Sequence, residues 1–337
     1  MAKERQSNLE LCRLASIVLV MLVHTTYTTL GTNVSFGVML LEGFSIIGVN
    51  VFILLTGYFS ASPKKTSLIN LAFICLFWMI VRVLCRYFFG EPIDYKYVFF
   101  ITSSNWFIAS YVGLLFLAPI LNVFCKTVSK KTLLGGALFL ILLEIWYDWI
   151  PPMPKVRWGV QNGYSVLSFA ILYLVARAIR IYGLPNWFRK LSPLIYVGCS
   201  FAFAFMMYVL VHSGYGTPGA VEWVMAYINP IVIVSSISFL SMFEQVNIQS
   251  RIINYIAKST LACLFGHIAI IFLYKKQFLF IYENFSGIQV VLYWILAIVI
   301  VFCASIAIDQ IRLLLYRPIE KLIQRKIKNN EILPIDN

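Results

Sequence analysis

Residues 9–27 have the sequence LELCRLASIVLVMLVHTTY, an apolar run that carries Glu10 and Arg13 near its start and His24 well inside it. Such a run is long enough for a membrane helix, which needs about 20 apolar residues. Charged and titratable groups are costly in the hydrocarbon, so each one there is a candidate functional residue. Arg13 and His24 are eleven residues apart, which places them on one helix face and about 16 Å apart along the axis. Glu10 lies three residues before Arg13 and is placed to pair with it.

The whole chain has the composition of a membrane protein. Of its 337 residues 61% are hydrophobic and only 12% are charged, and the mean hydropathy is +0.84. Soluble domains carry about 25% charged residues, and one water-soluble core cannot bury this much apolar surface. The net charge of +13 does not indicate nucleic-acid binding, because the basic residues lie in short clusters between apolar runs.

The apolar runs predict an all-α polytopic membrane protein with about ten transmembrane helices. Continuous runs of this length favour helices over the alternating strands of a barrel. The predicted spans are approximately 9–31, 37–60, 67–89, 105–124, 132–150, 163–182, 192–212, 222–243, 257–275 and 289–313.

The distribution of Lys and Arg predicts that both termini are cytoplasmic. With that orientation, seventeen basic residues fall in cytoplasmic segments: Lys3, Arg5, Lys64, Lys65, Lys126, Lys130, Lys131, Arg180, Arg189, Lys190, Arg251, Lys258, Arg317, Lys321, Arg325, Lys326 and Lys328. Five fall in outer loops: Lys96, Lys155, Arg157, Lys275 and Lys276. This is a strong positive-inside bias. We therefore expect one multi-pass domain over residues 1–337 in the cell membrane, with a short basic cytoplasmic tail at about 317–337.

Other residues at membrane depth have two possible explanations each. Arg13 alone is explained by a snorkelling anchor, and His24 alone by an interhelical hydrogen bond, but their shared face favours one polar channel. His267 lies in the middle of the ninth predicted span, where it either faces the same cavity as His24 or makes a structural hydrogen bond.

The seven cysteines are scattered without metal-ligand spacing, so we expect no metal site and no bound cofactor.

Five segments, taken in order, resemble the membrane-bound acyltransferase 3 family of polysaccharide O-acetyltransferases. They span about 270 residues and are LELCRLASIVLVMLVH at 9–24, GVNVFILLTGYF at 48–59, NWFIASYVGLLFLAPILN at 105–122, NGYSVLSFAILYLVARAIR at 162–180 and STLACLFGH at 259–267. Thr56 replaces the usual serine of the second segment. The basic cluster that commonly follows it is reduced to Lys64 and Lys65, with Arg82 and Arg86 further on.

The resemblance implies transfer of an acyl group, usually acetyl, from cytoplasmic acyl-CoA to a hydroxyl of a cell-surface polysaccharide or lipid-linked glycan. It implies that His24 is the general base, because a neutral imidazole suits this role near neutral pH. Arg13 would hold a CoA phosphate or the thioester end, or orient His24. The remaining assignments are supporting roles for Glu10, His267 and Glu42, acyl-CoA contacts for Lys64, Lys65, Arg82 and Arg86, and acceptor contacts for Asn105, Trp106 and Tyr164.

A transporter or flippase is the alternative function. Arg13, His24 and Glu42 would then form the path of a proton or of an anionic or sugar-linked substrate. Many transporters contain internal repeats, and no convincing repeat relates the two halves of this chain, which favours the enzyme. A non-catalytic membrane sensor is a third possibility. The oligomeric state stays open. So does the path of the acyl group, which either stays on a CoA arm that threads the bundle or is handed along it.

Overall fold

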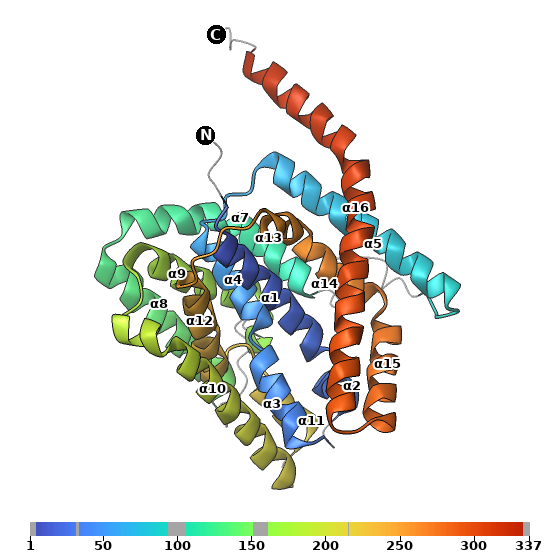
Figure 1. Cartoon of the computed structure of the whole chain (residues 1–337). Helices are drawn as coiled ribbons and strands as arrows, with labels where there is room; N and C mark the ends of the chain where they lie inside the picture. Colours follow the sequence, from blue (N-terminus) through green and yellow to red (C-terminus); the bar gives the residue numbers. More distant parts are fainter. Residues whose placement is uncertain (1–4, 32–33, 94–105, 151–160, 215, 333–337) are drawn as a thin grey trace.

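The computed structural model describes residues 5–31, 34–93, 106–150, 161–214 and 216–332, and in these parts of the chain the regular structure is entirely helical (Figure 1). The α-helices are α1 (Ser7–Val23), α2 (Tyr27–Leu30), α3 (Phe36–Ser45), α4 (Gly48–Tyr58), α5 (Lys65–Phe88), α7 (Trp106–Thr127), α8 (Lys130–Glu144), α9 (Val166–Tyr182), α10 (Asn186–His212), α11 (Pro218–Val224), α12 (Pro230–Glu244), α13 (Arg251–Ile256), α14 (Thr260–Ala269), α15 (Ile271–Asn284) and α16 (Ile288–Ile332). The shorter helical turns are η2 (Ile145–Trp149), η3 (Gln161–Gly163) and η4 (Ala257–Ser259).

Within the described residues, seven helical segments are long and apolar enough to cross a membrane: Phe36–Tyr58, Lys65–Phe88, Trp106–Thr127, Lys130–Trp149, Asn186–His212, Arg251–Ala269 and Ile288–Arg325. The other three predicted spans coincide with α1, α9 and α12, which have 17, 17 and 15 residues. The structure thus confirms a helical membrane protein. The number of ten crossings and the cytoplasmic position of the termini remain predictions.

Helices α1 and α4 form the centre of the bundle. Helix α1 packs against α3, α4, α12, α14 and α16, and α4 packs against α9 on its other side. Two glycines permit these close approaches. A Cβ at Gly48 would lie 2.7 Å from the Ser16 carbonyl oxygen on α1, and a Cβ at Gly57 would lie 2.6 Å from the Tyr173 carbonyl oxygen on α9. Helices α1 and α4 therefore bring their motif segments, 9–24 and 48–59, into the interior of the bundle.

Helices α5, α7, α8, α10 and α16 form the outer layer. Their outward faces expose large apolar side chains, among them Leu76, Ile80, Phe116, Ile120, Leu138, Phe139, Phe201, Phe205, Leu292 and Leu296. Contiguous apolar surface of this extent is unfavourable in water and is expected against lipid.

The segments with the predicted cytoplasmic charges gather at one end of the bundle. Ser7 Oγ accepts a hydrogen bond from Ser250 N, Arg180 Nη1 donates to the Tyr58 hydroxyl, and Tyr316 donates to the Thr66 carbonyl. Figure 1 shows α1 beginning and α16 ending toward this same side. Helix α16 continues to Ile332, so the predicted tail is helical as far as that residue.

Four predicted spans are interrupted as helices, and the one predicted at 37–60 breaks at residues 46–47, between α3 and α4. The first ends at Val23, where the Thr25 and Thr26 hydroxyls donate to the Leu22 and Val23 carbonyls and compete with the helix. The span predicted at 222–243 begins only at Pro230, behind an irregular segment at 225–229. The span predicted at 257–275 is interrupted at Ile270. Irregular backbone at membrane depth is tolerated only where protein buries it or where it lines a cavity.

Candidate active site

His24 lies at the C-terminal end of α1, directly after the last helical residue. Its Nδ1 is 2.8 Å from the Val20 carbonyl oxygen. A carbonyl only accepts hydrogen bonds, so this contact assigns the proton of the neutral ring to Nδ1 and makes Nε2 the basic nitrogen. The Thr29 hydroxyl donates to the His24 carbonyl at 2.5 Å, which fixes the turn that follows. His24 is therefore held in one tautomer and one orientation.

His267 occupies the equivalent place near the end of α14. Its Nδ1 is 2.9 Å from the Cys263 carbonyl oxygen, and its ring centroid is 5.0 Å from that of His24. The residue is fully buried, and its Nε2 has no hydrogen-bond partner. The structure thus brings together the two histidines that the sequence left as alternatives.

A cavity of about 310 Å³ lies beside His24. Its wall includes Ile17, Val20 and Val23 of α1, together with Arg82 of α5 and Phe265 of α14. Several helix interruptions meet there: His24, the junction between α3 and α4, Tyr164 before α9, and Tyr227 before α12. A volume in this range suits a small substrate group rather than a whole polymer.

Three aromatic rings form one side of this cavity. The ring centroid of Trp106 is 4.4 Å from that of Tyr164 and 5.7 Å from that of Tyr227, and the two tyrosine rings are 5.0 Å apart. Trp106 and Tyr164 were predicted acceptor contacts, and the structure places both in the wall of the His24 cavity. The predicted contact Asn105 lies outside the described residues.

Buried polar side chains hold the irregular segments around the cavity. Asn50 donates its side-chain amide to the Tyr227 carbonyl at 2.8 Å, and Ser110 donates to the Tyr164 carbonyl at 2.9 Å. Tyr227 N donates to the Asn162 carbonyl at 3.0 Å. These bonds satisfy backbone groups that the interrupted helices leave free. The aromatic wall is therefore preorganised.

The four residues predicted to contact acyl-CoA lie in different places. Arg82 is buried in the wall of the His24 cavity. Arg86, one turn along α5, donates Nε to the Pro92 carbonyl at 2.7 Å and lies over the Phe272 ring. Lys64 and Lys65 are exposed at the opposite end of α5. The structure brings Arg82 to His24 and leaves the two lysines apart from it.

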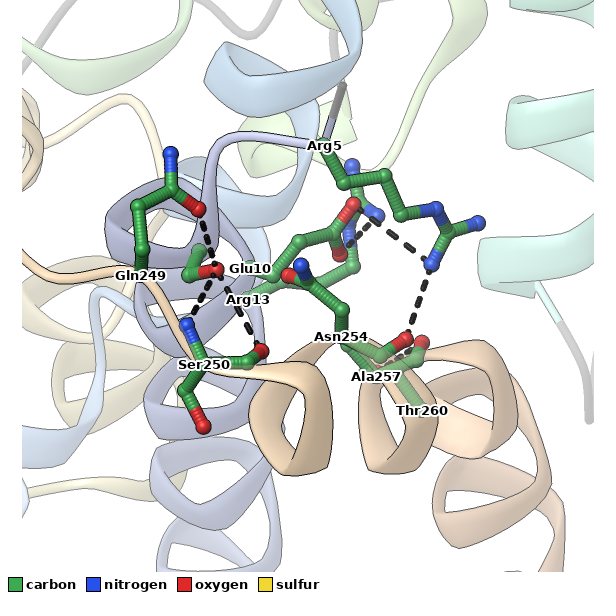
Figure 2. A network of polar contacts seen from close by, with 9 residues as sticks. Arg5, Glu10, Arg13, Gln249, Ser250, Asn254, Ala257 and Thr260 are labelled. Atoms are coloured by element: carbon green, nitrogen blue, oxygen red, sulfur yellow. Dashed lines mark hydrogen bonds and ion pairs between the residues drawn. The ribbon is translucent and has the colours of Figure 1, made fainter. Parts of the chain in front are cut away.

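Arg13 faces a second cavity at the other end of α1. Its Nη1 donates to Glu10 Oε2 at 2.6 Å, and Arg5 approaches the other Glu10 oxygen at 3.7 Å. Figure 2 shows the Glu10 carboxylate between the two arginines, with Arg5 also reaching the Asn254 carbonyl of α13. Among the described residues, the walls of the Arg13 and His24 cavities share none. Within the part of the chain that the structure describes, the two cavities are therefore separate.

Glu42 lies outside the wall of the His24 cavity. It is buried on α3 and accepts a hydrogen bond from Thr26, two residues after His24. Its contact holds the turn at the end of α1, so its support of His24 is indirect.

Sequence reasoning missed Tyr227 and Asn50, which lie 177 positions apart and meet only in the fold. A third missed residue is Arg312, whose Nε is 2.5 Å from Asp309 Oδ1 in a buried ion pair and whose Nη1 donates to Asn70. The sequence does contain a signal for this ion pair. Asp309 and Arg312 are opposite charges three residues apart on an apolar helix, and such residues are placed to pair.

The family model for the acyltransferase domain matches residues 6–310. No curated protein and no solved structure matches the chain. The matched range includes His24 and His267, the whole wall of the His24 cavity, and the wall of the Arg13 cavity except Arg5. The chain therefore belongs to the acyltransferase 3 family and is a membrane acyltransferase.

Proposed function

We propose that the protein transfers an acyl group, acetyl in the simplest case, from cytoplasmic acyl-CoA to a hydroxyl of a cell-surface polysaccharide or lipid-linked glycan. The observation that carries the proposal is His24, held with Nε2 as its basic nitrogen in the wall of a cavity that also contains Arg82 and an aromatic platform. Family membership supports acyl transfer, and the site chemistry supports an oxygen acceptor.

The reaction follows from these groups. The acceptor hydroxyl gives its proton to His24 Nε2, and its oxygen attacks the thioester carbonyl carbon. Arg82 is placed to stabilise the negative charge that develops on the carbonyl oxygen. The C–S bond then breaks, and the CoA sulfur takes the proton from His24. The products are an ester and free CoA, and His24 returns to its neutral state.

The aromatic wall supports a carbohydrate as the acceptor. Trp106, Tyr164 and Tyr227 present flat apolar faces beside polar edges, a combination that suits the two kinds of surface on a sugar ring. Their position in the wall with His24 would bring a stacked sugar next to the base.

The donor is proposed to come from the Arg13 end of α1. The basic segments gather there, and Arg13 is separated from His24 by about 16 Å along the axis of α1. An extended pantetheine arm can cover such a distance once the side chains between the two cavities move.

The test compares surface polysaccharide from a wild-type and a deletion strain by NMR. We expect an O-acyl ester that is present in the wild type, absent from the deletion strain and restored by the wild-type gene but not by Arg13→Ala. An unchanged ester pattern with an unmodified sugar precursor accumulating inside the cell would contradict the proposal and favour a transporter.

A further inference from the structure

The Arg13 cavity is a second, strongly basic cavity of about 420 Å³. It lies between the start of α1, the end of α4 and the end of α9, and four arginines face it: Arg5, Arg13, Arg177 and Arg180. Its other walls are Gln6, Glu10, Tyr58, Phe59 and Ser60. Arg177 and Arg180 belong to α9 and were part of no predicted site.

The charges in this cavity are only partly balanced. Glu10 pairs with Arg13 and Arg5, and Glu244 hydrogen-bonds the Tyr58 hydroxyl that also accepts from Arg180. Glu244 also interacts with Arg189, so these two carboxylates are shared among five arginines and positive charge remains in excess. Uncompensated cations near the interior of a membrane protein are unfavourable unless a ligand completes them.

Arg177 is the most informative of the four. It is only 8% exposed, and its Nε has no hydrogen-bond partner. Its side chain hydrogen-bonds the Cys125 thiol. No carboxylate of the described residues lies within 4.0 Å of its guanidinium nitrogens. A lipid-facing anchor would reach toward water, whereas this guanidinium is buried in the wall of the cavity. Its unused donor is what an anionic ligand would satisfy.

We propose that this cavity binds the diphosphate of the acyl-CoA donor, with Arg177 and Arg180 as phosphate ligands beside Arg13. This inference rests on the proposed function for the identity of the donor. A diphosphate diester carries one negative charge on each phosphorus, which is opposite in sign to the excess charge of the cavity. Planar guanidinium groups bind phosphate oxygens through paired hydrogen bonds.

The positions of these arginines also indicate how the donor would be oriented in the cavity. The side chains of Arg5 and Arg13 are 44% and 23% exposed, while Arg177 is buried, so the cavity runs from an accessible rim inward. Arg13 lies at the end of the α1 face that leads to His24. A diphosphate fixed here would leave the pantetheine arm free to extend along α1 toward the second cavity.

The test measures CoA binding to the purified full chain in phosphatidylcholine nanodiscs by calorimetry, with pantetheine as the probe that lacks phosphate. We expect wild type to bind CoA far more tightly than pantetheine, and Arg177→Gln to weaken CoA binding at least about tenfold. Arg180→Gln, an exposed position where folding is not at risk, should weaken it similarly. Arg251→Gln, an exposed arginine outside the cavity wall, is the matched control and should bind as wild type.

Each other result overturns the assignment. If Arg177→Gln and Arg180→Gln bind CoA like Arg251→Gln while wild type still transfers acyl groups, this cavity is not the donor site and the proposed function stands. If wild type binds no CoA, both the donor site and the donor are wrong. If the two variants lose only phosphatidylglycerol, measured in nanodiscs containing that lipid, the cavity is a lipid headgroup site.

Discussion

His24 and His267 end two separate helices with their ring centroids 5.0 Å apart, and each donates Nδ1 to the carbonyl four residues earlier in its own helix. The pair therefore presents two Nε2 atoms as proton acceptors in one place. His24 lines the cavity, whereas His267 is fully buried behind it. We assign the chemistry to His24 and a positioning role to His267.

Replacing His267 by Leu should lower kcat about ten- to hundredfold and leave both KM values unchanged. The ring supports the face of His24, and small misplacements of a catalytic group cost rates of this size. His267→Asn, which keeps a polar group at this position, should retain more activity than His267→Leu. Equal kcat in wild type and His267→Leu would show that the ring has no part in placing His24.

Trp106→Ala should raise KM for the glycan acceptor about tenfold while the KM for acetyl-CoA stays constant. The change removes one face of the aromatic wall without touching His24 or the basic cavity. Steady-state kinetics with the glycan fraction identified from the deletion strain give both constants. Trp187→Ala, an exposed tryptophan at the start of α10, is the control. A selective loss of acetyl-CoA affinity would place the donor, not the sugar, at this wall.

Gly57→Ala should destabilise the bundle by about 1–3 kcal/mol. The added Cβ would lie 2.6 Å from the Tyr173 carbonyl oxygen and 2.9 Å from Ala176 Cβ, and backbone cannot move aside easily. Gly135→Ala on α8 provides the matched control, because nothing lies within 4 Å of its new methyl group. Thermal unfolding in nanodiscs compares the two variants. A Gly57→Ala protein as stable as Gly135→Ala would disprove the close contact between α4 and α9.

Much of the architecture can be predicted from the sequence because it depends on residues that are close together along the chain. Long apolar runs predict the helices, and the three-residue spacing predicts the contact between Glu10 and Arg13, which forms at 2.6 Å. The helix interruptions cannot be predicted in this way, since the sequence stays apolar through them. The turn after His24 depends on threonine hydroxyls and on Glu42, and the segment at Tyr227 depends on Asn50, 177 residues away. These contacts exist only in the folded bundle.

The same limit applies to the site. Arg13 and His24 stand out because charge in a membrane helix is conspicuous in a sequence. Arg177 is equally charged, but at the end of a span it is indistinguishable from a topological anchor until its burial and its unpartnered Nε are known. Arg82 was predicted to contact acyl-CoA, and the fold places it in the wall of the His24 cavity.

The most direct test of the account is acyl transfer by His24→Ala. Membranes containing the full chain are supplied with acetyl-CoA that carries a radioactive acetyl group, and label is counted in the glycan fraction. The account predicts a loss of roughly 100- to 10,000-fold relative to wild type, with unchanged CoA binding and unchanged thermal unfolding. Transfer by folded His24→Ala at near wild-type rate would show that His24 is not the base.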